Sequence, residues 1–166
     1  VLTLDPLDPT STFRIAAGEV RSRGFEVNVA GDLTPEWRVI GGYAYTDSEV
    51  TRDNSLPRGT RQANIPRNSF NLLSVYEFRD GALRGLGLGA NFKYVDDRAG
   101  QTAAQTYTME RYAVTDLLSF YQVNEHLRLN LDVRNVFNKG YEEGAFNFYA
   151  YPGEPRTVQT GFAYTF

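Results

Sequence analysis

Apolar and polar residues alternate along much of this chain, as in β-strands with one apolar face. In LRLNLDVRNVF, which begins at Leu127, the first alternate residues are Leu or Val, with Arg, Asn or Asp between them. The last stretch, TVQTGFAYTF, alternates in a similar way up to Phe166. Chain ends are commonly polar and frayed. We therefore expect this apolar end to be buried, paired with another strand or in contact with lipid.

Seven long strands are predicted from this alternation and from the turn residues between them. They cover approximately residues 20–33, 37–48, 70–78, 86–94, 111–123, 127–137 and 157–166. The fifth alternates poorly, so its two faces cannot be assigned from the sequence. The opening DPLDPTST is predicted to be a loop. The connections alternate between short turns, such as LTPE and VNEH, and long loops at about 49–66, 96–109 and 138–155.

The rhythm of short and long connections is typical of outer-membrane barrels, which have short periplasmic turns and long extracellular loops. By this rule Phe166 lies on the periplasmic side. Most of the predicted strands also exceed the ~5–6 residues usual in soluble proteins and reach the ~9–11 that span a membrane. Alternation alone does not distinguish a polar face turned to solvent from one turned to a lumen. A soluble β-sandwich or β-solenoid therefore stays open as an alternative.

Composition narrows the classes of function. The chain has 166 residues, a formal net charge of -3, no Cys and one His. Without Cys there is no disulfide framework or thiolate metal site, and the mild acidity gives no support for binding nucleic acid. No apolar run approaches the ~18–20 residues of a transmembrane helix. Seven strands do not close a bacterial barrel, which uses an even number. The chain is therefore either a fragment of a larger barrel or has an eighth strand before residue 18, and we favour the fragment.

Five stretches resemble, in order, the late barrel strands of TonB-dependent ferric-siderophore receptors: GEVRSRGFEV, LTPEWRVIGGYAYTDSEV, GLGLGANFKYVDDR, RNVFNKGY and GEPRTVQTGFAYTF. The resemblance implies an all-β fold, an antiparallel transmembrane β-barrel of 22 strands in the outer membrane. Residues 1–166 would be the C-terminal portion of this barrel domain, holding about its last seven strands. The plug domain and the segment that contacts the TonB complex would lie outside this chain.

The resemblance also implies a function and a set of partners. The receptor would take up ferric siderophores, with energy delivered through the TonB complex, and it would have no cofactor of its own. The chain end is similar to the signal read by the barrel-assembly machinery, a polar residue, Gly, an aromatic residue and a final Phe. The matching residues are Gln159, Gly161, Tyr164 and Phe166. The remaining expected partner is the lipid of the outer membrane.

Aromatic and cationic residues in the predicted long loops are the candidates for contact with the siderophore. Tyrosine covers a large area while keeping a hydroxyl for hydrogen bonding, and arginine suits an anionic chelate. The aromatic candidates are Tyr141, Phe146, Phe148, Tyr149 and Tyr151, and the cationic ones are Arg58 and Arg61. Packing against neighbouring loops or against the lipid interface is the alternative role for the aromatic loop.

We find no pattern that indicates catalysis, so the chain is not predicted to be an enzyme. The single His126 lies in a short turn that offers no pocket. The carboxylate pairs Asp96–Asp97 and Glu142–Glu143 are interpreted as solvated loop residues, not as a cation site. Two other functions stay open: a TonB-dependent receptor for another cargo, such as cobalamin or an oligosaccharide, and a small structural or adhesin barrel.

Overall fold

The computed structural model describes residues 2–10, 12–16, 18–101, 106–146 and 149–166. Apart from one 3-10 turn, η1 (Gly81–Leu83), every regular element in these ranges is a β-strand. The predicted all-β class is therefore confirmed. No helix in the described ranges is long and apolar enough to cross a membrane.

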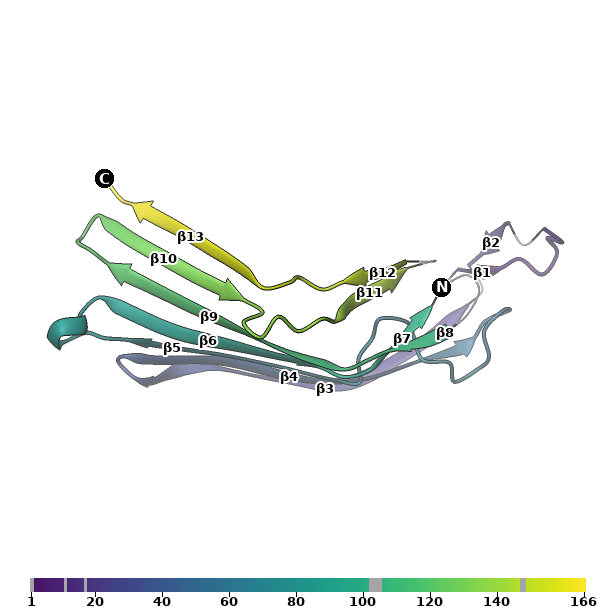
Figure 1. Ribbon diagram of the computed structural model, residues 1–166. Helices are drawn as coiled ribbons and strands as arrows, with labels where there is room; N and C mark the ends of the chain where they lie inside the picture. Colours follow the sequence, from purple (N-terminus) through teal and green to yellow (C-terminus); the bar gives the residue numbers. More distant parts are fainter. Residues whose placement is uncertain (1, 11, 17, 102–105, 147–148) are drawn as a thin grey trace.

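Seven long strands form one curved antiparallel sheet (Figure 1). Its strands are β3 (Glu19–Thr34), β4 (Trp37–Arg52), β5 (Asn68–Glu77), β6 (Leu86–Val95), β9 (Tyr112–Gln122), β10 (Leu127–Arg134) and β13 (Thr157–Tyr164). Each strand pairs with the next long strand along the chain, and β3 and β13 lie at the two edges. These strands match the seven that the alternation predicts.

Three short hairpins accompany the sheet, and the sequence pattern missed them. They are β1 (Thr3–Leu4) with β2 (Arg14–Ile15), β7 (Arg98–Gln101) with β8 (Thr106–Met109), and β11 (Glu142–Phe146) with β12 (Tyr149–Pro152). The last two occupy the predicted long loops. Figure 1 shows both at the end of the sheet opposite the C-terminus. We call this the long-loop end and the opposite end, where the short turns lie, the turn end.

One face of the sheet is apolar across all seven strands, and we call it the apolar face. Directly paired residues share a face, so the pairs Phe25–Tyr45 and Leu129–Phe162 belong to it. The same registers place Leu117 and Tyr121 of β9 on this face, which resolves the strand whose faces the sequence left unassigned. Many of its large side chains are exposed, Phe25 and Phe162 at 57% and 75%.

The opposite face, called the polar face, carries most of the charged residues of the strands. Asn91 pairs with Asp116, and Asp132 pairs with Gln159. A single layer of sheet covers neither face, so the few well-buried residues gather elsewhere. Val95, Tyr112 and Val114 form a small core with Tyr141 packed against it. This core lies at the long-loop end, where the chain folds over the sheet.

Candidate functional site at the long-loop end

Three connecting segments meet at the long-loop end: residues 53–67, the β7–β8 hairpin and the β11–β12 hairpin. Asn64 joins all three, because its backbone N–H donates to the Ala99 carbonyl at 2.8 Å while its side chain bonds Ala145. The Asn64 amide donates to the Ala145 carbonyl and its oxygen accepts from the Ala145 N–H, each at 2.8 Å. This side chain imitates the pairing of a neighbouring strand. The segments therefore form one packed unit.

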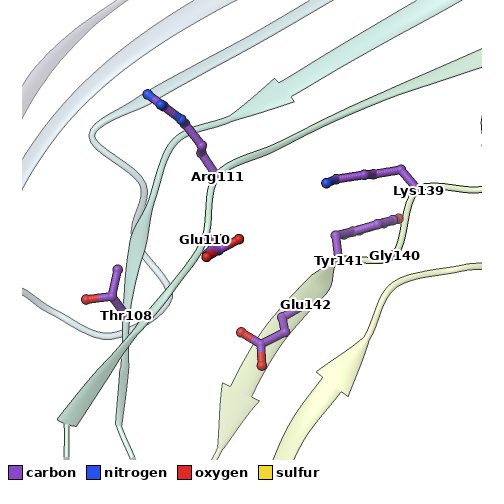
Figure 2. Close-up of a pocket in the computed structure, with 7 residues that line it drawn as sticks. All are labelled: Thr108, Glu110, Arg111, Lys139, Gly140, Tyr141 and Glu142. Atoms are coloured by element: carbon purple, nitrogen blue, oxygen red, sulfur yellow. The ribbon is translucent and has the colours of Figure 1, made fainter.

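A cavity of about 410 Å³, here called the seam pocket, lies between two of these segments. Figure 2 shows Thr108, Glu110 and Arg111 on one side, and Lys139, Gly140, Tyr141 and Glu142 on the other. None of the ion pairs among the described residues includes Arg111 or Lys139. Two cations and two carboxylates thus border a space that suits a polar ligand carrying both signs of charge.

An exposed aromatic face lies on the β11–β12 hairpin. Phe146 pairs directly with Tyr149, and Tyr151 pairs with Gly144, so all three rings share one face of the hairpin. They are 66%, 67% and 51% exposed. Ala145, which points to the opposite face, is buried. The hairpin therefore packs on one side and offers three rings on the other. The fourth candidate, Phe148, lies outside the described residues.

Tyr141 differs from the other aromatic candidates because its ring is already packed. It stacks on Tyr112 with 4.2 Å between ring centroids and is only partly exposed. Burial raises the pKa of its phenol above the usual value. Its edge still lines the seam pocket. The structure therefore places Tyr141 at the base of the β11–β12 hairpin, beside the aromatic face and not on it.

The two arginine candidates lie in different surroundings. Arg61 donates to the Asp97 carboxylate at 2.6 Å and to the Asp97 carbonyl at 2.7 Å. The hydrogen bond from Arg61 holds the pKa of Asp97 below its usual 3.8. Arg58 is exposed and lies beside Gly59, which has a φ of 86°. Arg61 thus links segment 53–67 to the start of β7, while Arg58 is exposed to solvent.

The proposed assembly signal lies on the edge strand β13 and just beyond it. Gln159 and Gly161 are on the polar face, paired with Asp132 and Asn130, while Tyr164 is on the apolar face. Phe166 is fully exposed, and its ring meets that of Tyr164 edge-on at 5.2 Å. His126 lies nearby in the turn, where its Nδ1 is 2.9 Å from the Thr165 carbonyl oxygen.

Sequence reasoning missed the buried polar residues that hold this end together. Arg98 is 4% exposed and donates to the carbonyls of Glu142 and Glu143, at 2.6 Å for Glu143. Asn135, 3% exposed, donates from its side chain to the carbonyls of Lys139 and Glu154, each at 2.9 Å. Asn135 belongs to the quoted RNVFNKGY motif, but no sequence signal singled out Arg98.

Asn135 and Asn138 of RNVFNKGY turn the chain after β10, since their φ values of 46° and 51° lie in the left-handed region. In the described part of the chain, no group of three or more His, Cys, Asp or Glu residues is placed to hold a metal ion.

Comparisons with known proteins identify the family. The family model "TonB dependent receptor-like, beta-barrel" matches residues 1–136. The chain is 42% identical over 159 residues to the metal-pseudopaline receptor CntO of Pseudomonas aeruginosa, covering 95% of this chain and 22% of that protein. It is 33% identical over 143 residues to the ferrichrome outer membrane transporter/phage receptor of Escherichia coli, covering 84% of this chain and 19% of that protein.

The fold agrees with these relatives. The crystal structure of the siderophore receptor PiuA from Acinetobacter baumannii matches with a TM-score of 0.81 and 27% identity, over 98% of this chain and 24% of that one. The chain thus spans about a fifth of the length of the curated relatives reported above. They are receptors and a transporter, in agreement with the prediction that the chain is not an enzyme. By the match of the family model over most of its residues, this chain belongs to the TonB-dependent receptor β-barrel family.

Proposed function

We propose that this chain is the C-terminal part of the barrel of an outer-membrane receptor that takes up ferric siderophores or related metal chelates. The plug domain and the segment that contacts the TonB complex would belong to the same receptor outside residues 1–166. In this proposal the apolar face meets lipid and the polar face lines the lumen. The long-loop end is extracellular, and the turn end is periplasmic.

One observation supports this proposal above the others. An exposed aromatic face and a pocket lined by charged residues lie together at the long-loop end of the sheet. Phe146, Tyr149 and Tyr151 offer apolar area with two hydroxyls, as chelate shells with aromatic or amide groups require. The seam pocket supplies cations and carboxylates for the polar parts of a chelate. Arg58 adds an exposed cation at the same end. No transition-metal ligands are needed, since the metal arrives already wrapped.

A second candidate cargo has support of its own. The 42% identity with the metal-pseudopaline receptor favours a chelate whose metal is not restricted to iron. The seam pocket, which is lined by Glu110, Arg111, Lys139 and Glu142, would suit a chelate that carries both signs of charge. Cobalamin or an oligosaccharide would need less charge at this place. A purely structural or adhesin barrel would need neither the aromatic face nor the pocket.

The test is uptake of labelled chelates by the complete receptor. It would be expressed in an Escherichia coli strain that lacks its own siderophore receptors, with and without a working TonB protein. Ferrichrome, a ferric catecholate, ferric pyoverdine, metal-pseudopaline and cobalamin would be compared at equal concentration. We expect TonB-dependent uptake of at least one of the four metal chelates. Uptake of cobalamin alone, or no binding of any of the five, would overturn the proposal.

Beyond its cargo, the receptor would have two partners of its own membrane. We propose that the barrel-assembly machinery reads Gln159, Gly161, Tyr164 and Phe166 on the free edge strand, since an unpaired strand edge is a template for pairing. Outer-membrane lipid would cover the exposed side chains of the apolar face, since a soluble monomer rarely leaves a contiguous apolar patch of more than a few hundred Å² open to water.

A further inference from the structure

The β11–β12 hairpin does not continue the sheet where its register leads. Because β10 pairs with β9, a straight continuation would lay β11 beside β8, the strand that precedes β9. Instead β11 lies against β7, the far strand of the β7–β8 hairpin. The seam pocket is bordered by the end of β8 on one side and the entry to β11 on the other. Specific contacts are therefore needed to hold β11 against β7.

Arg98 of β7 makes the contacts that do so. Its two terminal nitrogens donate to successive carbonyls of β11, those of Glu142 and Glu143. The guanidinium also lies over the Tyr112 ring, 5.3 Å from its centroid. Among the described residues no carboxylate forms an ion pair with it, although it is 4% exposed. Among the described residues its two terminal nitrogens are bonded by carbonyls, while its buried Nε has no hydrogen-bond partner. A buried cation held by two fixed carbonyls and a ring is directional, so it favours this placement of β11.

We propose that Arg98 is the positioning residue of the receptor's ligand-facing aromatic face. By fixing the β11 backbone it sets the direction of Phe146, Tyr149 and Tyr151, and it keeps the seam pocket open between β8 and Lys139. Arg98 itself does not touch the ligand. The expected effect of Arg98 on ligand binding rests on the proposed function. Its effect on the position of the β11–β12 hairpin can be tested without any ligand.

The physical consequence is a population effect. Without the two hydrogen bonds from the Arg98 guanidinium, the β11–β12 hairpin adopts other positions as well. Only a fraction of the receptor molecules then has the hairpin in the position that binds the chelate. Apparent affinity falls by that fraction. If the competent placement drops to a tenth, the chelate binds ~10-fold more weakly. A lysine keeps the charge but supplies one point donor in place of a planar fork, so Arg98→Lys should lie between the wild type and Arg98→Ala.

The experiment measures hairpin placement and binding separately in the complete receptor. Residues 1–166 contain no Cys. Once any Cys elsewhere in the receptor is replaced by Ser, cysteines introduced at the exposed positions Ala150 and Thr108 carry the spin labels across the two hairpins. We expect one narrow distance in the wild type, a broad distribution in Arg98→Ala and an intermediate one in Arg98→Lys. Arg14→Ala, at an exposed arginine of the β1–β2 hairpin, is the matched control and should change nothing.

The outcomes distinguish the positioning role of Arg98 from the proposed function of the receptor. Unchanged distances in Arg98→Ala overturn the positioning role, whatever binding does. Broadened distances with ~10-fold weaker binding of ferrichrome or metal-pseudopaline support it. Broadened distances in a receptor whose wild type binds none of the chelates leave Arg98 a positioning residue while the proposed function fails. If Arg98→Ala does not assemble, as judged by heat-modifiable gel mobility, the distance and binding data of Arg98→Lys decide: a wild-type distribution in that variant overturns the proposal.

Discussion

Gly24 and Tyr45 approach each other so closely across the β3–β4 pair that a Cβ on Gly24 would lie 1.9 Å from the Tyr45 carbonyl oxygen. The obstacle is backbone, which cannot swing aside as a side chain can. Gly24 belongs to the stretch RSRGFEV that resembles the receptor family. Only a residue without a side chain fits here, so this glycine is explained by packing against β4.

The first prediction concerns this glycine. Gly24→Ala should destabilise the folded barrel by ~1–3 kcal/mol, the usual cost of forcing an extra methyl group into a packed site. Gly31→Ala is the matched control on the same strand, since a Cβ there meets nothing within 4 Å, and it should change stability by less than ~0.5 kcal/mol. Urea unfolding of the complete receptor in phospholipid vesicles measures both. Equal effects of the two substitutions would contradict the steric argument.

A second prediction tests which face meets lipid. Leu131 lies on the apolar face and its neighbour Asn130 on the polar face. Leu131→Arg should destabilise the receptor by ~2–4 kcal/mol, the cost of an arginine at the bilayer midplane on the lipid side of a barrel. Asn130→Arg should be tolerated, because a lumen can hydrate the charge. The same vesicle unfolding assay applies. A larger loss from Asn130→Arg would mean that the two faces are assigned the wrong way round.

The strands were predictable because side-chain chemistry repeats along each of them. In β10 the alternation of Leu127, Asn130 and their neighbours leaves one reading of the faces. In β9 the alternation fails, since Phe120 is apolar but lies on the polar face, where its ring centroid is 3.7 Å from the Arg128 guanidinium carbon. The Arg128 guanidinium stacks on the Phe120 ring, which lets this apolar side chain lie on the polar face. The sequence of β9 therefore does not show a regular alternation of apolar and polar residues.

The hairpins of the candidate site were not predictable for a different reason. Their strands are only four or five residues long, at the lower limit of the ~4–8 residues over which alternation can be recognised. What holds them is contact between distant segments: Asn64 and Ala145 are 81 residues apart. A polar side chain that bonds the backbone of a residue far away in the sequence produces no recognisable pattern in the residues around it. The aromatic residues of the β11–β12 loop could be read as ligand candidates from composition, but their common face depends on the pairing of Phe146 with Tyr149.

The third prediction concerns Asn135, which combines a left-handed backbone with three side-chain hydrogen bonds, two to Lys139 and one to Glu154. Asn135→Gly keeps the backbone freedom but loses those bonds, so it should cost ~2 kcal/mol. Asn135→Ala also carries the strain of a positive φ and should cost ~1–2 kcal/mol more. Unfolding midpoints of both variants in one assay give the difference. If Ala is no worse than Gly, the backbone at 135 relaxes and the strain argument fails.

A fourth prediction follows from the pKa of Asp97, which Arg61 holds below the usual 3.8. A carboxyl with a depressed folded pKa contributes stability that is complete above its unfolded pKa and is lost as the pH falls through the folded value. The link between segment 53–67 and β7 should therefore survive to about pH 3.8 and loosen below it. A spin label at the exposed position 58 reports this as increased mobility. Asp97→Asn should show the mobile spectrum already at pH 7; a wild-type spectrum there would contradict the assignment to this pair.

The last prediction concerns Phe166, whose ring is fully exposed and makes one ring contact, with Tyr164 at 5.2 Å. Losing it should cost the finished barrel little stability, because within residues 1–166 the Phe166 ring buries little surface. If the final aromatic residue is read during assembly, however, Phe166→Ala should slow the appearance of the heat-modifiable barrel in a pulse-chase experiment. Its unfolding midpoint, once assembled, should stay unchanged. Leu83→Ala removes another exposed apolar side chain at the turn end, in η1, and is the control. A lower midpoint with a normal assembly rate would make Phe166 a packing residue and remove its role as a signal.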